Sequence, residues 1–442
     1  MLGAFGAIRV DPLGFLDTAW RTYGDVVQFP IPQPPAYLIN EPEAVRSVLV
    51  TNARAFGKRT IQYSALSLVT GEGLLVADTD EWRRQRPLVQ PAFHHGTIAR
   101  VVNEVGIAID GLISRWEAVI DLDAGHAPVV DVDEAMMHTA LDVVGRALFG
   151  ADLSADADRL VEATLAGLDV VIARARVPIS PPGWVPTPAN RRLRRSVREL
   201  DGAVRRMITQ RQMRTPTRGQ PEDMLDLLLS SVDESGEHLD ASEIRDQVVT
   251  FIVAGHETVA SALTWAWSLL ADHPEAMRRL QAESDEVLGG RLPTWEDIPR
   301  LPWARAVLDE ALRLYPPAWL ITRRALQDVV LGGRAVPAGS ILILSPYLVH
   351  RHPDLWPAPE SFDPQRFLTR IDPGRASFIP YGAGPRLCIG RDFATVEGTM
   401  ILAALAGRFD LQRRAARAPE SLPLVTIRPR GGMPLQVSRR ER

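Results

Sequence analysis

The segment FIPYGAGPRLCIG, residues 378–390, contains the only cysteine of this 442-residue chain. A lone cysteine is more often a small buried apolar residue than a ligand. Here three glycines, Gly382 and Gly390 among them, surround Cys388, and glycine lets a backbone turn tightly and approach a flat ligand closely. A helix is expected to begin just after the cysteine, where free N–H groups stabilise a thiolate. The segment therefore predicts a ligand cysteine, with Arg386 placed to pair with an acidic group of a cofactor.

The segment resembles the haem-binding signature of the cytochrome P-450 family, F-x-x-G-x-R-x-C-x-G. Tyr381 replaces the usual phenylalanine, and its ring is expected to pack on the sulfur side. The resemblance implies that Cys388 is the axial ligand of a haem b iron. It also implies that Tyr381, Gly382, Arg386 and Gly390 contact the cofactor. Further motifs of the family follow in the same order along most of the chain.

Residues 247–271 are nearly all apolar and long enough to cross a bilayer. However, His256 and Glu257 lie at the centre of the stretch, where an ionisable pair would be costly in a membrane. The stretch therefore predicts a long helix in the protein core, capped by Asp240 and ended before Pro274. No membrane span is expected.

The remaining patterns predict a mainly α protein with small β-sheets at its ends. The expected elements are helices over residues 12–23, 303–315 and 389–408, and strands over residues 26–29, 36–39, 328–331, 341–344, 424–427 and 434–437. The resemblance implies the cytochrome P-450 fold in one domain over residues 1–442. It also implies a haem buried between the long central helix and the helix after the cysteine.

Composition excludes several classes of partner and location. The formal charge is −4, from 50 basic and 54 acidic residues, which argues against nucleic acid or an anionic surface as the main partner. One cysteine cannot form an intrachain disulfide, so no oxidising compartment is required. The N-terminal sequence lacks the basic region of a secretory signal. We expect a monomer in the cytoplasm.

The sequence AGHET, from Ala254 to Thr258, is similar to the oxygen-activation motif of the family. Gly255 costs about 1 kcal/mol in a helix relative to alanine, and dioxygen lying against a locally widened helix would explain it. The resemblance places Ala254 and Gly255 at the cofactor, Thr258 beside bound oxygen, and Glu257 in proton delivery. The alternative for Thr258 is a hydrogen bond to the carbonyl of Ala254. His256 is expected to pack or cap locally, because the zinc motif's second histidine is lacking.

Glu310 and Arg313 are three residues apart and share one helix face. The alternative is a surface pair worth under about 0.5 kcal/mol, but the apolar residues on the same face indicate burial. The resemblance adds Arg366, in the segment FDPQRF, to this pair. We expect these three residues to support the fold and the cysteine loop.

Trp82 and Arg86 also share a helix face, at a spacing of four. The alternative is a basic, solvated helix. The resemblance places both side chains on a haem propionate, with Arg323 as another partner. The neighbouring Arg324 leaves an ambiguity of one residue.

By family spacing, the substrate pocket is predicted to contain Val253, Ala318, Trp319, Leu320, Ile321, Val425 and Thr426. Residues 61–74 are expected to form an entrance loop and residues 177–188 a mobile lid. Trp319 is expected to narrow the cavity. An apolar lining of this kind indicates a hydrophobic substrate such as a terpenoid, fatty acid, steroid or polyketide.

The resemblance implies a monooxygenase that inserts one atom of O2 into its substrate. Electrons would pass from NAD(P)H through a ferredoxin reductase and a ferredoxin. The ferredoxin is expected to dock on the cysteine side of the molecule, near Arg83, Arg84, His94, His95, Arg100 and Arg391. Two alternatives are a peroxide-driven or rearranging enzyme and a non-catalytic haem-binding protein. The intact pair Glu257–Thr258 favours the route that uses O2.

Overall fold

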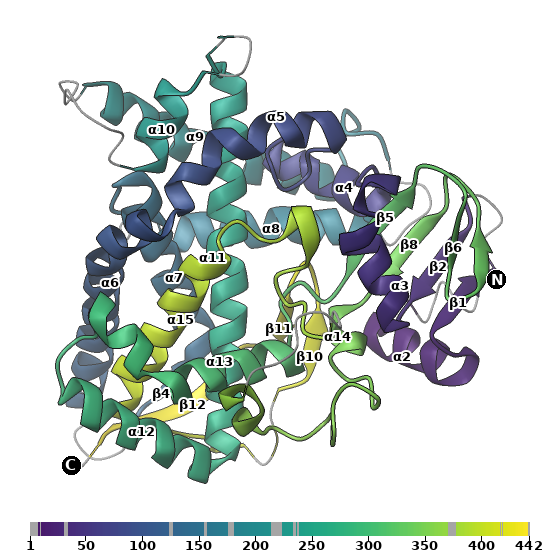
Figure 1. Ribbon diagram of the computed structural model, residues 1–442. Helices are drawn as coiled ribbons and strands as arrows, with labels where there is room; N and C mark the ends of the chain where they lie inside the picture. The colour runs from purple at the N-terminus through teal and green to yellow at the C-terminus, as the bar shows by residue number, and fades with distance from the viewer. Residues whose placement is uncertain are drawn as a thin grey trace.

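The computed structural model describes residues 8–440, except Arg9, 31–33, 123–126, 154–156, 176–180, 214–222, 233–235, Glu237, 370–376, Ala416 and Ala418. Most of this chain is helical (Figure 1). The helices are α2 (Pro12–Tyr23), α3 (Pro42–Arg46), α4 (Ile61–Thr70), α5 (Thr79–Val89), α6 (His95–Leu122), α7 (Val132–Phe149), α8 (Ala157–Ala175), α9 (Pro188–Met213), α10 (Met224–Ser230), α11 (Ala241–Asp272), α12 (Pro274–Leu288), α13 (Pro302–Leu314), α14 (Pro346–Val349) and α15 (Arg391–Ala406).

The strands form small sheets beside this helical body. They are β1 (Val26–Phe29), β2 (Ala36–Ile39), β3 (Phe56–Gly57), β4 (Val129–Asp131), β5 (Ile321–Ala325), β6 (Val329–Leu331), β7 (Arg334–Val336), β8 (Ile341–Leu344), β9 (Phe409–Gln412), β10 (Ser421–Pro423), β11 (Ile427–Pro429) and β12 (Pro434–Arg439). The largest sheet has the order β1-β2-β8-β5-β3, in which β2 and β8 are parallel. It therefore joins segments from both halves of the sequence (Figure 1). The predicted class, mainly α with small sheets, is confirmed.

Helix α11 runs through the middle of the helical body (Figure 1). The Asp240 side chain accepts hydrogen bonds from the backbone N–H groups of Ser242 and Glu243, and the Glu243 side chain accepts from the Asp240 N–H. This is the capping box that the sequence predicts. Among the described helices only α11 is long and apolar enough to span a membrane, but 83% of its apolar window is buried inside the protein. The helix therefore forms the core, as expected.

Two local predictions differ from the structure. Most of the expected entrance loop, residues 61–74, is the helix α4. This helix ends before Gly71, which has a φ of 66°. At the chain end, residues 424–427 form mostly a turn between β10 and β11, which pair with each other. The final strand β12 pairs instead with β4 and β9. Residues 177–180 of the expected lid lie outside the described residues.

Candidate active site

The cysteine loop is held in a tight turn before α15. The backbone N–H of Cys388 donates to the carbonyl of Tyr381 over 2.9 Å. Gly382 and Gly384 have φ of 71° and 69°, a region that favours glycine. A Cβ on Gly384 would also lie 2.0 Å from the carbonyl oxygen of Leu49. Gly390 differs, because its φ is −86° and a Cβ there would meet its neighbours at ordinary contact distance.

The thiol of Cys388 is exposed toward the cavity that it lines. Burial in the protein raises the pKa of this thiol, while a hydrogen bond from the Gly390 N–H and the charges of Arg86 and Arg391 oppose that shift. These groups offset part of the cost that burial imposes on the thiolate, although burial has the larger effect. Helix α15 begins at Arg391, so the sulfur lies next to a helix N-terminus, as the sequence predicts.

A cavity of about 300 Å³ opens above this loop. Its wall combines residues of α5, α11, β5 and the cysteine loop. The predicted site residues that line it are Trp82, Arg86, Ala254, Gly255, Thr258, Ala318, Ile321, Arg323, Tyr381, Gly382, Arg386, Cys388 and Gly390. Apolar side chains, among them Phe93, Leu148 and Phe251, complete it.

The predicted catalytic residue Glu257 and several predicted pocket residues are not among those that line the cavity. They are Val253, Glu257, Trp319, Leu320, Val425 and Thr426. The indole N–H of Trp319, just before β5, donates to the carbonyl of Leu424 over 2.8 Å, so this ring contacts the β10–β11 turn and is not part of the cavity lining. The Thr426 hydroxyl donates to the Glu257 carboxylate. The role of these positions in substrate binding stays a prediction.

The cavity wall contains four cationic side chains: Lys58, Arg86, Arg323 and Arg386. Arg86 donates to the carbonyl of Leu387 over 3.1 Å, and Arg386 donates to that of Ala77 over 2.6 Å. Arg323 is buried, whereas Arg324 is exposed. The structure thus places Arg323 and not Arg324 at the cavity.

Three of these cations, Lys58, Arg323 and Arg386, are close enough to affect one another's pKa. Burial and the charges of Arg323 and Arg386 hold the pKa of Lys58 well below its usual range. Burial, with the charge of Arg323, lowers the pKa of Arg386 to about 10. The described lining of the cavity contains no carboxylate, although Asp78 lies 3.6 Å from Arg386 behind it. The cluster is therefore suited to an anionic ligand that would relieve this repulsion.

The residues present fit the haem that the resemblance implies. Haem is flat, apolar and metal-bearing, and it carries two carboxylates. The cavity offers apolar walls, one accessible thiol and four buried or half-buried cations without carboxylate partners in its lining. Among the described cations of the lining, Lys58 extends the predicted set of Trp82, Arg86, Arg323 and Arg386.

Helix α11 contributes Thr258 to the cavity wall. The Thr258 hydroxyl donates to the carbonyl of Ala254 over 2.7 Å, which is the alternative that the sequence left open. Gly255 has a packing reason, because a Cβ there would lie 2.8 Å from Cγ2 of Val144 on α7. The helix stays α-helical through this turn. Close packing of α11 on α7, rather than a widened helix, accounts for this glycine.

Glu257 is buried on another side of α11. Its Oε1 accepts a hydrogen bond of 2.8 Å from the Thr426 hydroxyl. Burial raises the pKa of Glu257 to about 7, against the opposing effects of this bond and of Arg428. The carboxyl can therefore gain or lose a proton near neutral pH.

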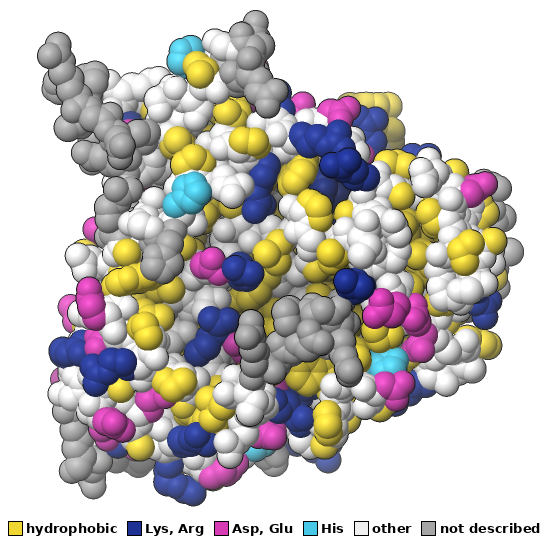
Figure 2. Space-filling view, viewed as in Figure 1, with side chains coloured by type: hydrophobic (Ala, Val, Ile, Leu, Met, Phe, Trp, Pro, Cys, Tyr) yellow, Lys and Arg dark blue, Asp and Glu magenta, His cyan; other side chains and the backbone are white. Residues whose placement is uncertain are grey.

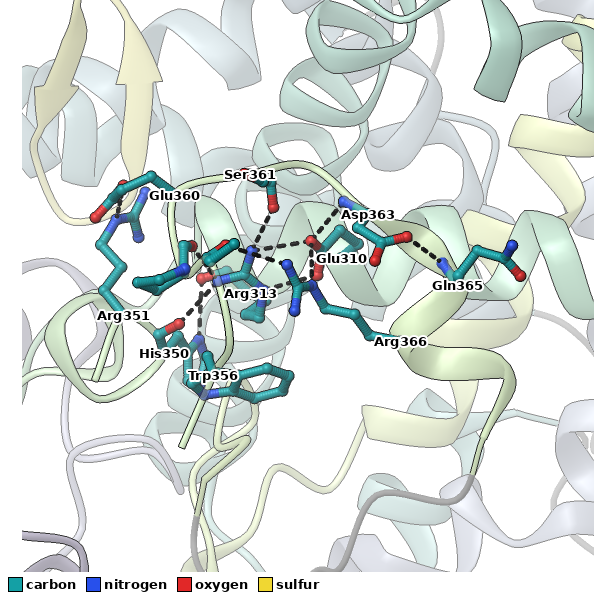
Figure 3. Close-up of polar contacts among 12 residues, drawn as sticks. Glu310, Arg313, His350, Arg351, Trp356, Glu360, Ser361, Asp363, Gln365 and Arg366 are labelled. Carbon is teal, nitrogen blue, oxygen red and sulfur yellow. Dashed lines mark hydrogen bonds and ion pairs between the residues drawn. The ribbon is translucent and has the colours of Figure 1, made fainter. Parts of the chain in front are cut away.

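Glu310, Arg313 and Arg366 form one network (Figure 3). Glu310 and Arg313 are both fully buried and joined by two hydrogen bonds of 2.7 and 2.9 Å. Arg366 donates to Glu310 over 3.3 Å. Arg313 also donates to the carbonyls of His350, Pro359 and Ser361. Every charge in the network thus has several partners, which a buried ion pair requires.

Sequence reasoning missed Lys58, Tyr63 and His350. Lys58 lies over the ring of Tyr63, with its nitrogen 4.1 Å from the ring centroid, and both line the cavity. His350 connects Arg313 to the backbone of Ile379 at the cysteine loop. No local pattern marks these residues, since their partners come from distant parts of the chain.

Comparisons with known proteins agree with this geometry. The family model described as cytochrome P-450 matches residues 7–433. Cyclooctatin synthase of Streptomyces melanosporofaciens is 39% identical, over 96% of this chain and 89% of that protein. Pentalenene oxygenase of Streptomyces avermitilis is 36% identical, over 90% and 86%. A crystal structure of CYP175A1 from Thermus thermophilus superposes with a TM-score of 0.77 at 33% identity, over 98% of this chain and 96% of that one.

Proposed function

Because this chain belongs to the cytochrome P-450 family and is a monooxygenase of that family, we propose that it inserts one oxygen atom of O2 into a terpenoid bound in the cavity at Cys388. The observation that carries this proposal is the composition of the cavity wall. A single thiol, four cations and the hydroxyl of Thr258 meet there among apolar side chains.

Cys388 would hold the haem iron, and Lys58, Arg86, Arg323 and Arg386 would hold its carboxylates, with Trp82 beside them. The ring of Trp82 already lies 4.8 Å from the guanidinium carbon of Arg386, an arrangement that orients both groups. When bound, the haem supplies the chemistry by which O2 is activated. The protein would hold the haem, orient the substrate and deliver protons.

Thr258 and Glu257 would share the delivery of protons. The Thr258 hydroxyl reaches the cavity, and the adjacent Glu257 carboxyl is buried with a pKa of about 7. A group with such a pKa can both give up and recover a proton at neutral pH. The apolar walls would exclude bulk water, so that protons arrive through these side chains.

A terpenoid substrate is favoured by the relatives and by the cavity. Two relatives are named for cyclooctatin and for pentalenene. In this chain Leu148, Phe251, Ala318 and Ile321 supply an apolar surface with few hydrogen-bonding groups. Such a wall selects a substrate by shape and hydrophobic area.

Electrons would pass from NAD(P)H through a reductase to a separate ferredoxin, and from the ferredoxin to this protein. The enzyme itself would be a monomer with a single domain in the cytoplasm. The face that carries α5 has a group of basic side chains with acidic ones beside them (Figure 2). Arg83 pairs with Asp80, Arg84 with Glu81 and Glu243, and Arg391 with Asp392. These local pairs reduce the charge available for docking. The side chains of His95 and Arg100 lie outside the described residues.

The decisive experiment is the absorption spectrum of reduced protein with carbon monoxide, for the wild type and Cys388→Ser. We expect a strongly red-shifted Soret band in the wild type and its loss in the variant. A folded, haem-loaded wild type without this band would exclude Cys388 as the ligand. Turnover of a terpenoid with peroxide, but not with O2 and a ferredoxin system, would instead favour the peroxide-driven alternative.

A further inference from the structure

The carboxyl of Glu257 and the hydroxyl of Thr258 lie on different sides of α11. Thr258 lines the cavity, whereas Glu257 is not among the described residues that do. The Glu257 side chain is 2% exposed and accepts a hydrogen bond from Thr426, in the turn between β10 and β11. The carboxyl is thus held against this turn rather than at the cavity.

The turn itself is clamped onto α11. The Ser261 hydroxyl and the Trp265 indole N–H both donate to the carbonyl of Ile427, over 2.7 and 2.9 Å. The next residue, Arg428, forms an ion pair with Asp133 of α7. Three contacts that leave Glu257 untouched therefore fix the backbone next to Thr426, and the hydroxyl is presented to the carboxyl by a rigid support.

Charged groups from several elements act on Glu257. Arg428 of β11 favours the carboxylate, while Asp133 of α7 and Asp169 of α8 oppose it. On α11 itself, burial and the charges of Arg428 and His138 keep the pKa of the neighbouring His256 low, at about 4. That imidazole is therefore neutral near pH 7. Of these two neighbouring side chains, Glu257 is therefore the one that can carry an exchangeable acidic proton near pH 7.

We propose that Thr426 is a positioning residue for proton delivery, whose hydroxyl holds the Glu257 carboxyl against the β10–β11 turn. The carboxyl reaches the Thr258 side of α11 only after this hydrogen bond breaks. It then gives its proton to the hydroxyl oxygen of Thr258, which releases its own proton into the cavity, and the resulting Glu257 carboxylate takes a proton from solvent before the next turnover. This inference rests on the role that the proposed function gives to Glu257.

The test compares Thr426→Val, which removes the hydroxyl at equal size, with Thr426→Ser, which keeps it. The infrared C=O band of the protonated Glu257 carboxyl, identified by its loss in Glu257→Gln, is titrated in haem-loaded protein without reductant. We expect the midpoint to rise in Thr426→Val by about one pH unit, because a donor to the carboxylate is lost. Thr426→Ser should keep the wild-type midpoint.

Turnover gives an independent readout. Glu257 delivers a proton only when protonated, so coupled product formation should fall as the pH rises through its pKa. This alkaline limb should move upward in Thr426→Val by the same interval as the infrared midpoint. An unchanged midpoint in Thr426→Val, or an equal shift in Thr426→Ser, would overturn the proposal. The infrared titration needs no turnover, so a failure of the monooxygenase proposal would be seen separately.

Discussion

The imidazole Nε2 of His350 accepts a hydrogen bond of 2.8 Å from the backbone N–H of Ile379, at the start of the cysteine loop. Its Nδ1 lies 3.2 Å from the carbonyl oxygen of Arg313. Because Nε2 accepts, the ring must be neutral, with the proton on Nδ1 donated to that carbonyl. One side chain thus joins the buried ion pair of α13 to the loop that carries Cys388.

The first prediction concerns acid stability. Burial and the charge of Arg313 lower the pKa of His350 to about 3. A group whose pKa is lower in the folded protein stabilises it above the unfolded pKa, and this contribution is lost as the pH falls. His350→Gln should therefore lose less stability than the wild type between pH 6.5 and 5, by about 2 kcal/mol. Urea unfolding at both pH values measures this difference.

The matched control is His238→Gln, since His238 is exposed. It should follow the wild type at both pH values. If His350→Gln also follows the wild type, the ring does not stay neutral in the folded protein and the assigned hydrogen bonds are incorrect.

The second prediction concerns the buried network of Glu310. Glu310→Gln leaves the fully buried Arg313 without its counter-charge. The loss of one partner of a buried ion pair should lower the free energy of unfolding by about 4 kcal/mol. The variant should unfold at lower denaturant concentration and retain less haem. The control Asp80→Asn breaks the exposed pair with Arg83 and should cost under about 1 kcal/mol. Equal effects of the two variants would contradict a structural role for the network.

Local signals in the sequence predicted the long helix and the cysteine loop well. Asp240 and Glu243 lie within one turn of each other, and Pro274 follows directly, so the bounds of α11 are set by neighbouring residues. The position of Cys388 just before the start of α15 is likewise set by neighbouring residues. Predictions of this kind depend on contacts within a few positions.

Positions set by distant segments were not predictable in this way. Residues 424–427 have the apolar pattern of a strand, but they form a turn whose partners, Ser261 and Trp265, lie on α11. Lys58 is buried against the carbonyl of Leu75 and the ring of Tyr63, and the charges of Arg323 and Arg386 act on it. A single sequence carries no signal of these pairings, so some predicted pocket residues, Val425 and Thr426 among them, do not line the cavity, whereas Cys388 does.

The third prediction tests why residue 255 is glycine. Alanine is the better helix former by about 1 kcal/mol, but its Cβ would lie 2.8 Å from Val144. Gly255→Ala should therefore destabilise the protein by about 1–3 kcal/mol through overpacking. Val144→Ala is itself destabilising because Val144 is fully buried, but Gly255→Ala should cost less in the Val144→Ala background than in the wild type. Thermal unfolding of the two single variants and the double variant measures this coupling, and an equal cost in both backgrounds would mean that the glycine serves another purpose.

The fourth prediction concerns the cation cluster. Lys58 is a buried lysine with the carbonyl of Leu75 and the ring of Tyr63 as its near neighbours. A haem carboxylate would supply the counter-charge that the cavity lining lacks. Lys58→Met should therefore release haem to apomyoglobin about tenfold faster, which corresponds to about 1.4 kcal/mol.

The control for Lys58 is Arg324→Met, because Arg324 is exposed next to the buried Arg323. Removing that charge should leave haem release unchanged. A second readout separates charge from packing. Loss of a cation near the carboxylates should lower the reduction potential of the bound iron, whereas Lys58→Arg should keep it. If Lys58→Met retains haem as the wild type does and the potential does not move, Lys58 serves only to close the cavity against the surface groove that it also lines.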